Sequence, residues 1–133
     1  MPKRENMRKT VREWIEISEY DLCTAEAMLK TKRFLYVMFM CQQAVEKILK
    51  AIYAMNSSEL PPRTHNLLYL VDALEISLRE EELMLLSRLN QFYLESRYPG
   101  ERIKLAKAVN KDKAREMLEK TKGVWKCLRQ KLL

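Results

Sequence analysis

The sequence predicts an all-α protein, an up-and-down four-helix bundle with an additional short helix. Two observations lead to this prediction. Only 2 of the 133 residues are Gly and 4 are Pro, so the chain has too few turn-forming residues for a fold of many short strands. Apolar residues recur at the three- and four-residue spacing of amphipathic helices, and no linker divides the chain. We therefore expect a single domain over residues 1–133, a length that suits one hydrophobic core.

The first two helices are expected from about residue 10 to 31 and from 34 to 55. Only a short break separates them, which favours an antiparallel hairpin. At 100° per residue the second helix has two different sides, with Gln43, Glu46, Lys47 and Lys50 on the polar one. The opposite, apolar side should pack into the core and holds Phe34, Val37, Met38, Cys41, Val45, Ile48, Leu49 and Ile52.

Pro61-Pro62 indicates a loop over residues 56–63, since consecutive prolines cannot lie inside a helix. A short helix is expected from Thr64, as its N-cap, to about residue 75. Ser77 and Glu80 have capping-box spacing and should open a longer helix that ends before Pro99.

The last part of the chain is expected as a loop over residues 99–109 followed by a helix that Asn110 caps. Gly123 would cost that helix about 1 kcal/mol relative to Ala. A close approach of another helix beside Val124-Trp125 would explain its presence.

The net charge of +7 lies entirely in residues 101–133, where 11 Lys or Arg accompany 4 Asp or Glu. A basic stripe of this kind attracts nucleic acid or an acidic protein. A solvated helix face explains it more simply, because no aromatic residues interleave with the cations as in a platform for single strands.

The three cysteines, Cys23, Cys41 and Cys127, have the spacing of neither a disulfide framework nor a zinc site. We expect reduced thiols, with Cys41 as a small core residue, and no metal or cofactor. No apolar run approaches the roughly 20 residues of a membrane span, and the first residues lack the apolar segment of a signal peptide. A cytoplasmic location is therefore expected.

A set of short motifs in a fixed order resembles the HEPN family of small prokaryotic helical proteins. The resemblance runs from Trp14 to about Trp125 and implies a helical bundle that is commonly a dimer. It also implies a partnership with a small nucleotidyltransferase-like protein, in a toxin–antitoxin arrangement, and contact with a nucleotide or RNA. The motifs are Glu19-Tyr20-Asp21-Leu22 with Ala25, Gln42-Gln43-Ala44-x-Glu46-Lys47-x-x-Lys50-Ala51, Thr64-His65-x-Leu67, and Arg97-Tyr98-Pro99.

The chain departs from the family in one respect that bears on catalysis. Many HEPN proteins are metal-independent ribonucleases that use an Arg followed after four to six residues by a His, a pair suited to stabilising a phosphate and moving a proton. After Arg97 the corresponding positions hold Arg102, Ile103 and Lys104, and no Arg precedes His65 at that spacing. We therefore expect a non-enzymatic interaction domain, with a ribonuclease of atypical site as the alternative.

The bundle could bring a group of cations, one His and one Tyr together as a site for a phosphorylated or nucleotide ligand. Each residue also has a structural explanation: Glu46 and Lys50 form a surface i,i+4 pair, and Tyr98 is a core residue with a solvated hydroxyl. Both interpretations stay open. The candidate ligand-binding residues are Lys47, Lys50, Arg63, His65, Arg97 and Tyr98.

A second group lies on the side of the second helix opposite its main apolar stripe: Tyr36, Phe39, Met40 and Gln43. A helix that is apolar on nearly every side must be covered on every side. The cover comes either from other helices of the chain or from a homodimer or partner interface.

Overall fold

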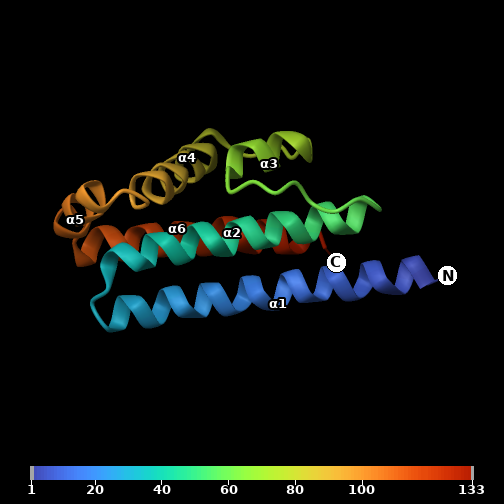
Figure 1. Ribbon diagram of the computed structural model, residues 1–133, viewed down its shortest axis with the longest axis horizontal. Coiled ribbons are helices and arrows are strands. Elements are labelled where there is room, and N and C mark those ends of the chain that lie inside the picture. Colours follow the sequence, from blue (N-terminus) through green and yellow to red (C-terminus); the bar gives the residue numbers. More distant parts are fainter. Residues whose placement is uncertain (1, 133) are drawn as a thin grey trace.

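The computed structural model describes residues 2–132, with side chains described from residue 9 onward. This part of the chain forms six helices and no strand, which confirms the all-α class (Figure 1). Among the described residues no helix is long and apolar enough to span a membrane. The helices are α1 (Pro2–Lys30), α2 (Phe34–Asn56), α3 (Leu67–Ala73), α4 (Glu80–Glu95), α5 (Pro99–Ala108) and α6 (Lys111–Gln130).

Helices α1 and α2 form the expected antiparallel hairpin and lie side by side along most of their length (Figure 1). The turn between them depends on Lys32, whose φ of 63° is in the left-handed region that usually ends a helix. The amide of Arg33 then donates to the carbonyl of Met28 at 2.8 Å, so the last turn of α1 is closed by backbone hydrogen bonds.

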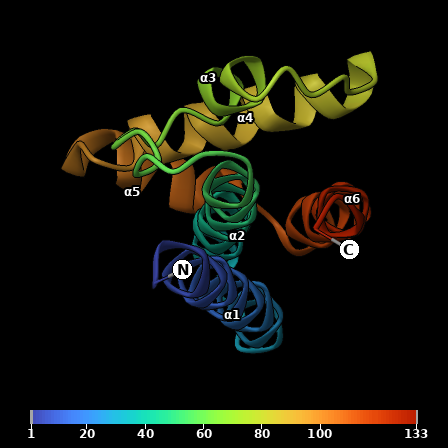
Figure 2. The ribbon, with the colours of Figure 1, turned by 90° about the vertical axis from the view of Figure 1, so that its right-hand side faces the viewer.

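Helix α6 packs beside the hairpin, and α4 crosses over it. Figure 2 looks along α1, α2 and α6, which appear end-on, while α4 lies across them on the side away from α1. One buried hydroxyl joins the three long helices: Trp125 Nε1 in α6 donates to Ser18 Oγ in α1 at 2.8 Å, and Ser18 donates to the Ala44 carbonyl in α2 at 2.5 Å.

Helix α2 is the centre of the core, as its apolar stripe predicted. Cys41 is fully buried there, and burial raises the pKa of its thiol to about 12, which confirms it as a core residue. The fully buried apolar residues of α2 are Val37, Met38, Cys41, Ala44, Val45, Ile48, Leu49 and Ala51.

Two expected boundaries were wrong. Residues 99–108 form helix α5 rather than a loop, because Pro99 is at the start of that helix, where its missing N–H is not needed. Helix α3 begins at Leu67, and its N-cap is Asn66 rather than Thr64: Asn66 Oδ1 accepts from the amides of Leu68 and Tyr69 at 3.1 and 3.2 Å.

Three further expectations concern helices α4 and α6: the residues that begin each helix, and Gly123 inside α6. Arg79 and Glu82, not Ser77 and Glu80, pair at the start of α4, where the Arg79 amide and Nε donate to Glu82 Oε1 at 2.9 and 3.2 Å. Asn110 caps α6 as expected, accepting from the Lys113 amide at 2.8 Å. Within the described part of the chain a Cβ added at Gly123 would meet nothing within 4 Å, so a close contact at that position does not explain this glycine.

Candidate functional site

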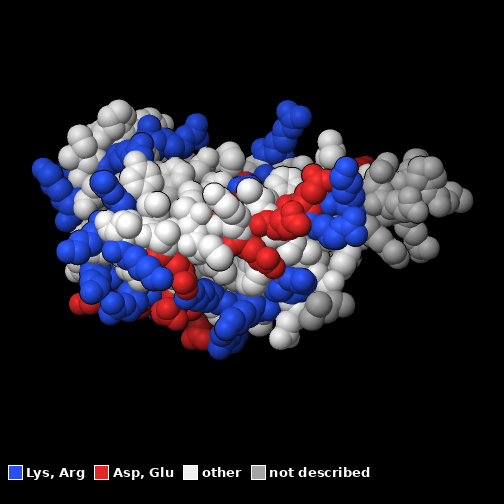
Figure 3. Space-filling view, turned by 90° about the horizontal axis from the view of Figure 1, so that it is seen from below, with Lys and Arg blue, Asp and Glu red and all other residues white. Residues whose placement is uncertain are grey.

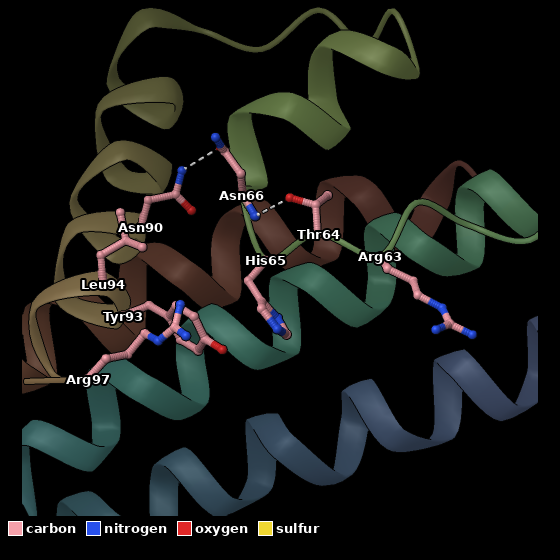
Figure 4. Close-up of a pocket in the computed structure, with 8 residues that line it drawn as sticks. All are labelled: Arg63, Thr64, His65, Asn66, Asn90, Tyr93, Leu94 and Arg97. Carbon is pink, nitrogen blue, oxygen red and sulfur yellow. Dashed lines mark hydrogen bonds between the residues drawn. The ribbon is translucent and has the colours of Figure 1, made fainter.

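The segment between α2 and α3 lies over the polar side of α2 and carries Arg63 and His65 (Figure 4). Gln42 of α2 anchors this segment, because its Nε2 donates to the His65 carbonyl oxygen at 2.8 Å. Asn90 of α4 fixes the next residues, with its Oδ1 accepting from the Leu67 amide at 3.0 Å and its Nδ2 donating to Asn66 Oδ1 at 2.9 Å. Side chains from two helices thus hold the backbone of the loop in place.

Glu46 is the centre of a buried polar network below this loop. Only 2 % of its surface is exposed, and its Oε1 accepts from His65 Nδ1 at 2.8 Å and from Gln42 Nε2 at 3.2 Å. Its other oxygen accepts from Lys50 Nζ at 3.1 Å, and the Lys50 ammonium lies 5.7 Å from the centre of the Trp14 ring. The Lys50 ammonium is therefore paired with the Glu46 carboxylate and also lies near the Trp14 ring.

Burial alone would raise the pKa of Glu46, but the hydrogen bond with His65 and the charge of Lys50 oppose it. Together with the bonds from Gln42 and Lys50 they outweigh burial, and the pKa of Glu46 is lowered. Glu46 is consequently a carboxylate near neutral pH and can only accept hydrogen bonds.

A pocket of about 310 Å³ opens above this network. In Figure 4, Arg97 extends along Tyr93 at the end of α4, while Arg63 extends in the opposite direction, away from His65. Burial and the charge of Glu46 raise the pKa of Tyr93, although Arg97 opposes this, so its hydroxyl stays protonated. The pocket is lined by Arg63, Thr64, His65, Asn66, Asn90, Tyr93, Leu94 and Arg97.

Aromatic rings continue from the pocket along the exposed side of α2. The centre of the His65 ring lies 4.9 Å from that of Tyr93, Tyr93 lies 5.2 Å from Phe39, and Phe39 lies 6.4 Å from Tyr36. Arg102 of α5 hydrogen bonds to the Tyr36 hydroxyl and covers its ring. Aromatic rings, which do not interleave with the cations of the C-terminal stripe, thus lie here beside Arg97 and Arg102.

Three of the six candidate ligand-binding residues line the pocket: Arg63, His65 and Arg97. The other three do not. Lys47 donates to Gln43 Oε1 at 2.7 Å and pairs with Asp21 at 3.4 Å. Lys50 is 7 % exposed and engaged with Glu46, so the Glu46–Lys50 pair is buried rather than on the surface as expected. Tyr98 is 68 % exposed beyond the end of α4, which corrects its interpretation as a core residue.

The candidate interface residues differ in how accessible they are. Tyr36 is 39 % exposed and Phe39 lies between Tyr36 and Tyr93. Met40 packs against the hydrophobic core of its own chain. Gln43 donates to Gln42 Oε1 at 2.7 Å and so supports the network below the pocket. Part of the cover that this side of α2 needs therefore comes from the chain itself.

The sequence analysis missed Tyr93 and Asn90 as pocket residues and Glu46 as the residue that orients His65. Tyr93 belongs to the apolar stripe of α4 by spacing, yet it lies one turn before Arg97, and that i,i+4 relation was the available signal. Nothing in the spacing of Glu46 distinguishes it from a surface glutamate.

The basic stripe is spread over α5 and α6 and is partly paired within the chain. Lys120 pairs with Glu116, and Lys122 with Glu119 and with Glu26 of α1. Seen from the α1 side, Lys and Arg gather at the end that carries α5 and the turn between α1 and α2, with acidic side chains among them (Figure 3). Among the described residues no group of three or more His, Cys, Asp or Glu is arranged to hold a metal ion.

Similarity to known proteins is found at the level of the fold and of the family. A search of curated proteins gave no match. The crystal structure of TT1696 from Thermus thermophilus is similar, with a TM-score of 0.78 over 91 % of this chain and 97 % of that one. At 22 % identity this likeness concerns the fold alone. The sequence model of the HEPN domain matches residues 11–131, and the chain belongs to the HEPN domain family.

Proposed function

We propose that this protein is a HEPN-type interaction domain whose pocket contacts a phosphorylated ligand, a nucleotide or RNA. The observation that carries the proposal is that Arg97, just after α4, lines one pocket together with Arg63 and His65 of the loop before α3. Guanidinium groups stay charged at every physiological pH and match the geometry of phosphate oxygens. Tyr93 supplies an aromatic ring beside them, which suits a nucleobase.

The partner that we propose is a nucleotidyltransferase-like protein in a toxin–antitoxin-type pair, with the HEPN domain as a homodimer. Family membership supports this, together with the exposed side chain of Tyr36 and the neighbouring ring of Phe39 on α2. The neighbouring reading frame in the genome tests the partner: a small nucleotidyltransferase gene there would support the pair, and an isolated gene would contradict it.

Nucleotide contact is tested by thermal unfolding of the wild-type protein and Arg97→Ala with millimolar mononucleotides. The proposal expects a rise in melting temperature for the wild type, since a ligand that binds only the folded state stabilises it. Arg97→Ala should show a smaller rise. No shift for any nucleotide would contradict the ligand part of the proposal.

A ribonuclease is the second candidate, because the structure brings the chain's single His into the same pocket as Arg97. Glu46 holds the imidazole at Nδ1 in the way that a carboxylate orients a general base. Incubation of RNA with purified protein and a metal chelator separates the two candidates. Cleavage that disappears in both Arg97→Ala and His65→Ala would establish the ribonuclease and reject the non-enzymatic domain.

A further inference from the structure

The tautomer of His65 follows from its surroundings. Its Nδ1 lies 2.8 Å from Glu46 Oε1, and Glu46 is a buried carboxylate that also receives the Lys50 ammonium at 3.1 Å. A carboxylate has no proton to donate, so the hydrogen of this bond belongs to His65 Nδ1. In the neutral imidazole the other nitrogen, Nε2, is then a hydrogen-bond acceptor.

The acceptor on His65 is available to a ligand. The side chain is 53 % exposed and lines the pocket, and no hydrogen bond joins its Nε2 to another residue in the described part of the chain. The ring cannot turn freely to hide Nε2, because Glu46 holds one edge and the Tyr93 ring packs against it, tilted by 39°, at 4.9 Å between ring centres.

Acceptors are scarce elsewhere in this pocket. Arg63 and Arg97 carry donors only. The amide oxygen of Asn66 already accepts from Leu68, Tyr69 and Asn90, and that of Asn90 accepts from the Leu67 amide. The Thr64 hydroxyl already accepts from the Asn66 amide at 3.1 Å, which leaves the Tyr93 hydroxyl as the other side-chain acceptor of the lining that no residue in the described part of the chain engages.

We propose that the pocket selects ribonucleotides over deoxyribonucleotides, with Arg97 holding the phosphate and His65 Nε2 accepting a hydrogen bond from the ribose 2′-hydroxyl. This rests on the proposed function, since it requires a nucleotide in the pocket. A ribonucleotide whose phosphate binds Arg97 and whose 2′-hydroxyl donates to His65 satisfies both residues together, whereas its 2′-deoxy counterpart lacks that hydroxyl and leaves the imidazole without this partner. The 2′-hydroxyl is the group that distinguishes RNA from DNA at a given site.

The test is calorimetric titration of the full chain with adenosine 3′- and 5′-monophosphates, each paired with its 2′-deoxy counterpart. For at least one pair we expect the ribonucleotide to bind about tenfold more tightly, the effect of one added hydrogen bond in an open pocket. In His65→Ala the ratio should fall to about one. This variant should fold, because Gln42 holds the His65 backbone rather than its ring.

Tyr93→Phe is the matched control, since it removes the competing acceptor and keeps the ring; the preference should persist in it. Equal binding of ribo and deoxy forms by the wild type would overturn the inference and leave the phosphate site intact. Loss of the preference in Tyr93→Phe but not in His65→Ala would also overturn it. No binding of either form would instead refute the proposed function together with this inference.

Discussion

Replacing Glu46 by Gln removes one charge from the centre of α2 and should be among the most destabilising substitutions of a polar residue. The change leaves the Lys50 ammonium, 9 % exposed in its side chain, without a counter-charge, and it replaces one of the two oxygens that accept from His65, Gln42 and Lys50 by an NH2 donor. Breaking a buried ion pair from one side costs about 3–5 kcal/mol. That is a large fraction of the roughly 5–15 kcal/mol by which a domain is stable.

The chain contains a matched control for this experiment. Glu116 and Lys120 form the same i,i+4 pair in α6 at 2.8 Å, but their side chains are 61 % and 59 % exposed. Because solvent screens an exposed pair, Glu116→Gln should change stability little. The double variant Glu46→Gln with Lys50→Met should recover part of the loss, since it removes the unpaired buried charge as well.

Urea unfolding followed by circular dichroism at 222 nm measures these differences in free energy. The expected order of stability is wild type and Glu116→Gln together, then the double variant, then Glu46→Gln. If Glu46→Gln is no less stable than Glu116→Gln, the buried network does not support the fold and the argument for a fixed His65 loses its basis.

Three further predictions concern pH, helix propensity and assembly. The folded-state pKa of Glu46 is lowered, so its contribution is complete above the unfolded value of about 4.3 and is lost as pH falls through the lower folded value. The stability gap between wild type and Glu46→Gln should therefore shrink below about pH 4, and a constant gap down to pH 2 would contradict the ionised carboxylate. Gly123→Ala should raise the free energy of unfolding by about 0.5–1 kcal/mol, because the added methyl meets no neighbour, and a fall in melting temperature would be inconsistent with that open space. Light scattering should find a wild-type homodimer that Tyr36→Glu converts to monomer with unchanged helix content, because a charge buried at an interface loses water without gaining a partner. Met40→Glu is a poorer probe, since Met40 packs against the core of its own chain. A wild-type monomer at high concentration would contradict the dimer.

The parts of the fold that depend on one helix at a time could be predicted from the sequence. The apolar stripe of α2, the hairpin of α1 and α2, and the Asn110 cap each follow from spacing or local chemistry within a few residues. The start of α5 did not follow, because a proline such as Pro99 is equally compatible with the end of one helix and the beginning of the next.

The site depends on what covers each helix, and a helical wheel does not contain that information. Glu46 and Lys50 have the spacing of a surface pair, and only the loop before α3 and the ring of Trp14 make the pair buried. Arg63, His65 and Arg97 were grouped by residue type, and this identified three of the eight residues that line the pocket. Asn90 and Tyr93 line the pocket because α4 crosses above α2, and the sequence does not contain that crossing (Figure 2).

We expect a nucleotide to bind in the pocket rather than on the basic stripe of α5 and α6. Titration calorimetry with adenosine monophosphate on the wild type, on Arg97→Ala and on a stripe variant with Lys111 and Lys113 changed to Gln separates the two places. Arg97→Ala should weaken binding by about 1.5–3 kcal/mol, the worth of a hydrogen bond to a charged group. The stripe variant should bind as the wild type does. Binding that Arg97→Ala leaves unchanged and that the stripe variant loses would contradict the pocket, and so would the absence of heat from the wild type at millimolar nucleotide.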